Sequence, residues 1–299
     1  MALVWLPFDP ARLGDVPAGL EFDTFGEGEP PTRIEEVEFW VPHYGFTLPY
    51  ADLVAAMTSL KVIQTQSAGV EHVKPHVPRS VTLCNARGVH DAATSELGVA
   101  LILASLRGLP ELVRAQDRHE WLPKRVWPAL ADRRVLILGY GSIGAALQRR
   151  LEGFECQVVR VALHRRAGVH PVDALDELLP TADVVVLLVP LSEATHHLVV
   201  AAFLARMKDD ALVVNLARGG IVDTDALVAE TATGRLRAAL DVTDPEPLAA
   251  DHPLWSTPGV LISPHVAGGT TAMEPRMSRL VRQQLGRFVA GEPLANVVD

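Results

Sequence analysis

Short runs rich in β-branched residues alternate with longer amphipathic stretches through the second half of the chain, and this alternation constrains the fold most strongly. Six runs are expected to be strands: residues 135–138, 158–161, 184–189, 212–215, 238–240 and 260–262. Helical patterns lie between them, at 143–151, 175–179, 201–207 and 224–231. Apolar strands separated by helices are typical of a parallel sheet with both faces covered. The alternation therefore predicts an α/β fold with a doubly wound parallel sheet.

The first third of the chain repeats this pattern less regularly, and 299 residues are enough for two domains of ordinary size. Strands are expected at 3–6, 22–25, 39–41, 62–64 and 81–84, with a helix within 48–60. A long apolar helix follows from Glu96 to Arg107, and a helical tail at 277–289 can return to the first domain. The predicted domains are residues 1–97 plus 275–299 and residues 98–274.

Composition narrows the classes of partner. A net charge of −9 without a long basic run argues against nucleic acid, whose phosphates require clustered Lys and Arg. The longest apolar runs, 99–106 and 184–189, are far shorter than the ~20 residues that cross a bilayer. The first ten residues lack a basic region, and Pro7 and Asp9 interrupt them, so no signal peptide is expected. These features predict a cytoplasmic protein with a small-molecule partner, no nucleic acid and no membrane span.

The expected strand at 135–138 leads into a G-x-G-x-x-G turn that opens a helix. Its glycines are Gly139, Gly141 and Gly144. They permit a tight turn and a close approach of the backbone to a pyrophosphate, which rests on the helix N-terminus. The glycine pattern alone is weak, but its setting between a strand and a helix favours a dinucleotide site over a turn that merely needs positive φ.

The acidic residue that would bind an adenosine ribose is absent from the end of the next strand. Ala162 stands there, and Arg165 and Arg166 follow. Guanidinium groups can bind a 2′-phosphate through charge-assisted hydrogen bonds, which favours NADP over NAD. The alternative is that both arginines belong to a solvated turn.

Four polar residues follow the carboxyl ends of successive predicted strands, where ligands bind in open parallel sheets. They are Arg218, Asp241, Glu246 and His265. Reduction of a keto acid needs a cation for the substrate carboxylate, a proton donor and a group that tunes the donor. Singly, the arginine could be a salt-bridge partner, the glutamate a turn residue and the histidine an ordinary one. Their placement at one edge favours a shared site.

The whole chain resembles the D-isomer-specific 2-hydroxyacid dehydrogenases, in particular the glyoxylate and hydroxypyruvate reductases. The matching stretches are residues 66–71, 85–88, 139–144, 215–219, 241–248 and 263–268. The resemblance implies two Rossmann-like domains, a dinucleotide-binding domain and a smaller flavodoxin-like substrate domain. It also implies a homodimer built around the long helix after Glu96. The main departure is Ala162, where NAD-specific members carry Asp; it puts the choice of NAD in doubt.

The resemblance also implies residue roles. Arg218 would bind the substrate carboxylate and carbonyl oxygen, His265 would donate the proton, and Glu246 would hydrogen-bond His265 and keep it protonated. The backbone amides of Ala68 and Gly69 would grip the substrate carboxylate when the cleft closes. The implied cofactor-binding residues, with Asp241 orienting the nicotinamide carboxamide, are Gly139, Gly141, Ser142, Ile143, Gly144, Arg165, Arg166, Pro190, Thr195, Ala217 and Asp241.

The leading interpretation is a reductase of small 2-keto acids that prefers NADP but can use NAD. Two alternatives stay open. One is an NAD-linked dehydrogenase of a larger or phosphorylated 2-hydroxy acid. The other is a non-enzymatic dinucleotide sensor, since a transcriptional corepressor uses this fold to bind partners. The intact Arg218, Glu246 and His265 set argues against the sensor, because fold alone does not decide function.

Other features invite interpretation. The pair His196 and His197, like the pair His72 and His76, lacks an accompanying Cys, Asp or Glu cluster in the sequence, so no metal site is predicted. Trp121 and Trp127 could reach a partner subunit's cleft or anchor their own loop, and we favour anchoring.

Overall fold

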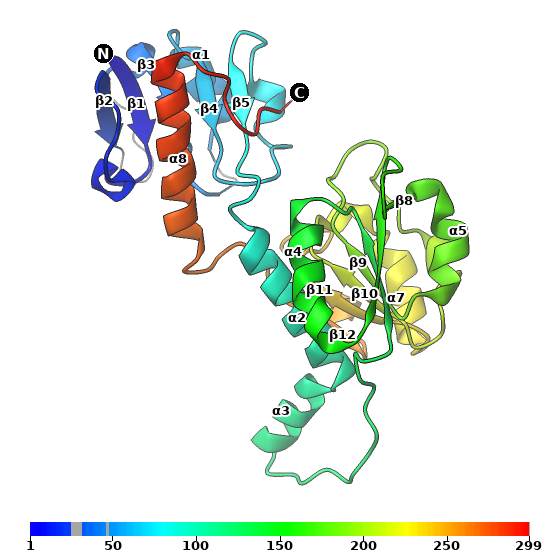
Figure 1. The fold of residues 1–299 in the computed structure, drawn as a ribbon. Helices are drawn as coiled ribbons and strands as arrows, with labels where there is room; N and C mark the ends of the chain where they lie inside the picture. Colours follow the sequence, from blue (N-terminus) through cyan, green and yellow to red (C-terminus); the bar gives the residue numbers. More distant parts are fainter. Residues whose placement is uncertain (25–31, 46–47, 299) are drawn as a thin grey trace. The chain divides into compact units, whose positions relative to one another are not determined.

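A computed structural model describes residues 1–24, 32–45 and 48–298, and the chain divides into two compact units. Unit 1 consists of Met1–His90 and Thr271–Asp299, and unit 2 consists of Asp91–Thr270. Each unit contains its own parallel sheet, so each is described separately (Figure 1).

Unit 1 is built on a five-stranded parallel sheet with the order β2-β1-β3-β4-β5. This is the flavodoxin-like order that the resemblance implies. The strands are β1 (Ala2–Leu6), β2 (Leu20–Thr24), β3 (Val37–Trp40), β4 (Val62–Gln64) and β5 (Thr82–Cys84). The strand predicted at 22–25 ends at Phe25, which lies outside the described residues.

Helices cover both faces of this sheet. On one face, α8 (Met273–Ala290) buries Met277, Leu280, Val281 and Leu285 in a cluster that includes residues of β1 and β3. On the other face, α1 (Tyr50–Ala56) contributes to a cluster with Trp5 and Trp40, whose rings stack at 5.4 Å. The C-terminal helix α8 therefore packs on the sheet formed by the first third of the chain and contributes to its core (Figure 1).

Unit 2 is built on a seven-stranded parallel sheet with the order β12-β11-β10-β9-β6-β7-β8. The order reverses between β6 and β9, which is the switch point where doubly wound sheets bind ligands. The strands are β6 (Arg134–Leu138), β7 (Gln157–Ala162), β8 (His170–Pro171), β9 (Val184–Leu187), β10 (Leu212–Asn215), β11 (Arg237–Leu240) and β12 (Val260–Ile262).

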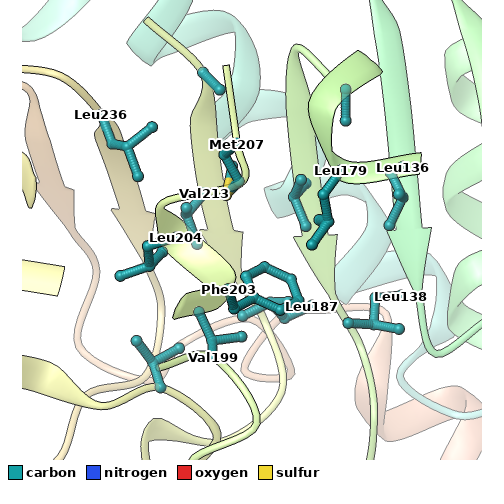
Figure 2. Close-up of a cluster of buried hydrophobic side chains, with 14 of the residues drawn as sticks. Leu136, Leu138, Leu179, Leu187, Val199, Phe203, Leu204, Met207, Val213 and Leu236 are labelled. Atoms are coloured by element: carbon teal, nitrogen blue, oxygen red, sulfur yellow. The ribbon is translucent and has the colours of Figure 1, made fainter. Parts of the chain in front are cut away.

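Two hydrophobic clusters cover the two faces of this sheet. One joins it to α2 (Asp91–Leu106) and α4 (Ser142–Leu151), and the other to α5 (Leu175–Leu178), α6 (Ala201–Leu204) and α7 (Thr224–Ala232). Figure 2 shows the second cluster, in which Phe203 and Leu204 of α6 lie among strand side chains such as Leu187 and Val213. The remaining helix, α3 (Leu109–Asp117), follows α2 and extends with the next loop away from the sheet (Figure 1).

The predicted fold class is confirmed, and the differences are one missed strand and several element ends. Strand β8, two residues at the sheet edge, was not predicted because its apolar signal is too short. Helix α2 begins at Asp91, five residues before the predicted Glu96, since its first turn is made of small and polar residues. Among the described residues, no helix is long and apolar enough to span a bilayer.

Candidate active site

Two glycines could not be replaced without displacing their neighbours: Gly139 in the turn between β6 and α4, and Gly144 in the first turn of α4. Gly139 has φ +97°, and a Cβ there would lie 2.4 Å from the carbonyl carbon of Leu188 and from the nitrogen of Val189. A Cβ on Gly144 is 3.2 Å from Cγ2 of Ile137, which keeps α4 close to β6. The turn thus brings the helix start against the switch point of the sheet.

The start of α4 has the geometry of an anion site. Gly141 precedes the helix without a side-chain cap, so the first amides, including those of Ser142 and Ile143, have no intrahelical acceptor. A Cβ at Gly141 would meet nothing closer than 4.0 Å, which leaves the backbone accessible. The Ser142 hydroxyl donates a 3.1 Å hydrogen bond to Asp91 Oδ1. These features fit the pyrophosphate of a dinucleotide.

The end of β7 carries no carboxylate. Ala162 is its last residue and is half-buried. The Arg166 guanidinium donates a hydrogen bond to the carbonyl of Tyr140, within the glycine turn, and Arg165 is exposed. Arg160, which was not singled out in the sequence, also points there, with its guanidinium carbon 5.8 Å from the Tyr140 ring centre. Two guanidinium groups, those of Arg160 and Arg166, therefore lie near Tyr140 at the carboxyl end of β7.

The hydroxyl of Thr195 stabilises the loop after β9 through hydrogen bonds within the loop. Thr195 Oγ1 donates to the carbonyl of Pro190 at 2.6 Å and accepts from the amide of Ser192 at 2.8 Å. This loop follows the strand next to β6, so Pro190 and Thr195 lie on the edge that carries the glycine turn. Their contact with a dinucleotide stays a prediction.

Arg218 lies just past β10 in an extended conformation and is half-buried. Asn215 holds the segment from both ends: its Nδ2 donates to the Arg218 carbonyl at 2.9 Å, and its Oδ1 accepts from the Ala217 amide at 3.1 Å. Gly219 was not predicted as a site residue, yet a Cβ there would lie 1.8 Å from the Thr243 carbonyl oxygen. The Arg218 loop is therefore packed directly on the loop after β11.

Asp241 is the buried anchor of the loop that carries His265. It is 2% exposed. Its Oδ1 accepts from the Ser263 hydroxyl at 2.7 Å and from the Val266 amide at 3.0 Å, and its Oδ2 accepts from the Ala267 amide at 3.0 Å. Both carboxylate oxygens thus hold the turn after β12. The predicted contact of Asp241 with a nicotinamide carboxamide stays a prediction, and its role toward this turn is the one that sequence reasoning missed.

Glu246 and His265 form the central polar pair. Glu246 Oε1 lies 2.5 Å from His265 Nδ1, and the two side chains are 40% and 26% exposed. His265 has φ +52°, and its amide donates to the Asp241 carbonyl at 2.7 Å, which fixes the backbone from which the ring projects. An imidazole oriented by a carboxylate is suited to proton transfer at its other nitrogen.

In unit 1, the loop after β4 presents two predicted substrate contacts. The carbonyls of Ser67, Ala68 and Gly69 each accept a side-chain hydrogen bond, from Thr65, Asn85 and Ser67 respectively. Within the part of the chain that the structure describes, the amides of Ala68 and Gly69 donate to no other group. Hydrogen bonds to its carbonyls therefore fix this loop, and the adjacent amides of Ala68 and Gly69 can donate to a carboxylate.

The two tryptophans of the loop after α3 behave differently. The Trp127 ring packs directly on Gly108, because a Cβ on that glycine would lie only 1.9 Å from the ring. The Arg125 guanidinium stacks on the same ring, 3.4 Å from its centre. Trp121 is 98% exposed. Anchoring is therefore confirmed for Trp127 and is wrong for Trp121 within a single chain.

The structure adds a carboxylate to one of the two histidine pairs. The sequence indicated no carboxylate beside His196 and His197, but Asp244 lies next to both, with the ligand atoms of all three within 4.8 Å of one another. Asp244 is distant in sequence and reaches the pair because the loop after β11 packs on the Gly219–Ile221 turn.

The family model for "D-isomer specific 2-hydroxyacid dehydrogenase, NAD binding domain" matches residues 99–267. The chain belongs to this family. It is 34% identical to a glyoxylate reductase of Thermofilum pendens over 258 residues, which cover 81% of this chain and 76% of that protein. It is 33% identical to the human glyoxylate reductase/hydroxypyruvate reductase, over 81% of this chain and 78% of the human one.

A solved structure gives the same result for the whole chain. The NADPH-dependent glyoxylate/hydroxypyruvate reductase from Sinorhizobium meliloti, in complex with NADP and sulfate, is 28% identical, with a TM-score of 0.86 over 100% of this chain and 98% of that one. This family member is therefore an oxidoreductase that acts on 2-keto and 2-hydroxy acids with NAD(P). The predicted family, fold, enzyme class and NAD(P) cofactor are confirmed.

Proposed function

We propose that this dehydrogenase reduces a small 2-keto acid, glyoxylate or hydroxypyruvate, to the matching D-2-hydroxy acid, with NADPH preferred over NADH. The observation that carries the proposal is the 2.5 Å contact between Glu246 Oε1 and His265 Nδ1. Arg218 lies at the same carboxyl edge of the unit 2 sheet. The substrate choice is supported by relatives named glyoxylate reductase and glyoxylate reductase/hydroxypyruvate reductase.

Each residue of this set has one task in the proposed reduction. Bound NADPH supplies the hydride. Arg218 binds the substrate carboxylate, which orients the keto group. The amides of Ala68 and Gly69 are the carboxylate donors that we assign to unit 1. His265 Nε2 donates a proton to the keto oxygen as negative charge develops there. Glu246 fixes the ring orientation through Nδ1 and stabilises the imidazolium between turnovers.

The cofactor preference is argued from the end of β7. Ala162 leaves that position uncharged, where a carboxylate would repel a 2′-phosphate, and Arg165 and Arg166 follow it. Arg166 already touches the glycine turn through Tyr140. Guanidinium groups at this position favour the extra phosphate of NADP. Two related structures carry NADP or NADPH, one from Sinorhizobium meliloti and one from Xanthobacter autotrophicus.

We assign the dinucleotide-binding role to unit 2, which contains the glycine turn, and the substrate-binding role to unit 1, which contains the loop of Ala68 and Gly69. The predicted boundaries near residues 97 and 275 are part of this proposal. We further propose that the enzyme acts in the cytoplasm, where NADPH and 2-keto acids are both available.

We also propose a homodimer, which the resemblance places around α2, and we extend its interface to α3 and the loop after it. This segment exposes Leu109, Leu112, Val113, Trp121 and Val126, the last two at 98% and 99%. Apolar side chains of this size on one projecting segment mark an association surface. Light scattering should give twice the chain mass for the wild type, and the double substitution Trp121→Ser with Val126→Ser should lower it. A wild-type monomer would rule the dimer out.

The test of the reaction is a set of initial rates. Purified protein is supplied with NADPH or NADH and with glyoxylate, hydroxypyruvate, pyruvate or a bulkier 2-keto acid. We expect the highest kcat/KM for NADPH with one of the first two acids. Higher rates with NADH would overturn the cofactor preference alone. Absence of turnover with every pair, although dinucleotide binds, would overturn the proposed substrate.

A further inference from the structure

The loops after β9 and β11 bring together three side chains that have no part in the proposed reduction. His196 and His197 follow Thr195, and Asp244 lies two residues before Glu246. The imidazole nitrogens and carboxylate oxygens of the three lie within 4.8 Å of one another, and all three side chains are exposed. Neither loop alone supplies the cluster, so it depends on the tertiary fold.

Backbone geometry explains why two adjacent histidines face the same way. Neighbouring side chains in an extended segment point to opposite sides. His197 instead has φ +49°, and its ring stacks on that of His196 with centres 4.1 Å apart and planes 23° from parallel. The His197 amide donates to the Gly220 carbonyl at 2.8 Å, and the His196 amide donates to Ser192 at 2.8 Å. These hydrogen bonds fix the backbone of both histidines.

Gly220 lies beside both His196 and Asp244. A Cβ on Gly220 would lie 3.5 Å from Asp244 Oδ2 and 3.5 Å from His196 Cδ2, so the residue is in contact range of both. The Thr224 hydroxyl holds the Asp244 backbone through a 2.8 Å bond to its carbonyl. Across the described chain, no hydrogen bond or ion pair engages the ring nitrogens of either histidine or the Asp244 carboxylate.

Two imidazoles and one carboxylate are the ligand set that borderline divalent cations prefer, with bonds of about 2.0–2.2 Å to zinc. Tetrahedral ligands at such distances are roughly 3.3 Å apart. Exposed side chains can rotate by the small amount that separates this spacing from the observed one. Water then completes the coordination sphere, because three protein ligands leave a position open.

We propose that His196, His197 and Asp244 form a binding site for Zn²⁺ or a similar transition-metal cation. The cation bridges the loop that ends at Thr195 and the loop that leads to Glu246. It is held by groups outside the proposed catalytic set, so binding does not depend on the proposed reduction.

The test uses untagged protein, freed of metal with EDTA and then of EDTA, because a histidine tag would bind the same ions. Zn²⁺ is titrated by calorimetry, and Co²⁺ by its visible absorption, near neutral pH. We expect one equivalent to bind. His197→Ala and Asp244→Asn should each weaken binding at least tenfold, and His170→Ala, which changes an exposed histidine of β8, should leave it unchanged. Acidification should weaken wild-type binding, because a protonated imidazole is no ligand.

Three results would overturn the proposal. The first is a wild type that binds neither ion. The second is a pair of variants, His197→Ala and Asp244→Asn, that bind as well as the wild type while their circular dichroism is unchanged. The third is an equal loss in His170→Ala, which would place the ion elsewhere. His196→Gln, which keeps the side-chain size, provides a second variant if His197→Ala proves unstable.

Discussion

Glu246 and His265, nineteen positions apart, are joined by a 2.5 Å contact between Oε1 and Nδ1. Glu246 follows β11 and His265 follows β12, and these strands are parallel neighbours. Asp241 stabilises the backbone near this contact. Its carboxylate accepts hydrogen bonds from Ser263, Val266 and Ala267, in the turn that carries His265. The proposed proton donor is therefore fixed by two carboxylates with different tasks: one orients its ring and the other its backbone.

Replacement of His265 should remove proton donation without removing the dinucleotide site. We expect His265→Gln to lower kcat by about 10²–10⁴, the usual contribution of a general acid. NADPH affinity, measured by fluorescence titration, should change by less than threefold. A variant with wild-type kcat would exclude His265 as the donor.

Glu246→Gln tests the partner of the same pair. The amide keeps the size and an acceptor but loses the charge that stabilises an imidazolium, so we expect a smaller fall in kcat, about tenfold to a hundredfold. Asp251→Asn, an exposed change in the same loop, is the control and should leave kcat unaltered; an equal fall in both variants would contradict a specific role for Glu246.

Two glycines of one turn should respond differently to alanine. Gly139→Ala places a Cβ 2.4 Å from the Leu188–Val189 backbone at φ +97°, so we expect a loss of about 1–3 kcal/mol in the free energy of unfolding. Gly141→Ala meets no atom closer than 4.0 Å and should keep its stability but bind NADPH at least tenfold more weakly. Urea unfolding and NADPH titration measure the two effects. Equal stability losses would contradict this assignment.

A carboxylate at the end of β7 should reduce the preference for NADPH. We expect Ala162→Asp to lower kcat/KM for NADPH tenfold or more and to affect NADH less, because the new charge repels only the 2′-phosphate. Gln157→Asp adds the same charge at the exposed opposite end of the strand and is the control. If both variants lower the NADPH rate equally, net charge and not position is responsible.

Asp183 should stabilise unit 2 in a pH-dependent way. Burial alone would raise its pKa, but hydrogen bonds from the Arg134 amide, Lys208 and Arg133 outweigh burial and hold the pKa below its ordinary value of 3.8. A lowered folded-state pKa means that this stabilisation is present above the unfolded pKa and is lost as pH falls through the folded one.

Asp183→Asn should therefore cost about 1–3 kcal/mol in the free energy of unfolding near neutral pH, and the difference from wild type should shrink below about pH 4. Urea unfolding at several pH values measures both. Asp176→Asn, whose carboxylate is 69% exposed in its pair with Arg206, is the control and should cost less than about 1 kcal/mol. If the loss of unfolding free energy in Asp183→Asn were the same at every pH, the charge of Asp183 would not be the source of the stabilisation.

Much of the fold could be predicted because its signals are local. The strands of unit 2 are continuous apolar runs, and a buried parallel strand requires such a run whatever its neighbours are. Helix ends were less accurate. Helix α8 begins at Met273, before the predicted residue 277, since Pro275 is tolerated in a first turn and the apolar repeat starts only after it. Strand β8 owes its assignment to pairing with β7, which no local pattern encodes.

The site was predicted in outline by a topological rule. Residues after the carboxyl ends of parallel strands share an edge, so Arg218, Asp241, Glu246 and His265 could be grouped from the sequence alone. The rule says nothing about distance. It could not distinguish Asp241, buried under a turn, from Glu246, exposed and paired with the histidine. The exposure of Trp121 was equally invisible, because a tryptophan's burial depends on which surfaces its loop meets.

The sequence alone determined the alternation of strands and helices, the glycine turn, the missing carboxylate at Ala162 and the residue types at the sheet edge, since each is a property of consecutive residues. The tertiary structure alone decided the Glu246–His265 contact, the burial of Asp241 and the approach of Asp244 to His196 and His197. The reason is physical: these groups lie on different loops, and their separations follow from strand register and from backbone conformations such as φ +52° at His265 and +49° at His197.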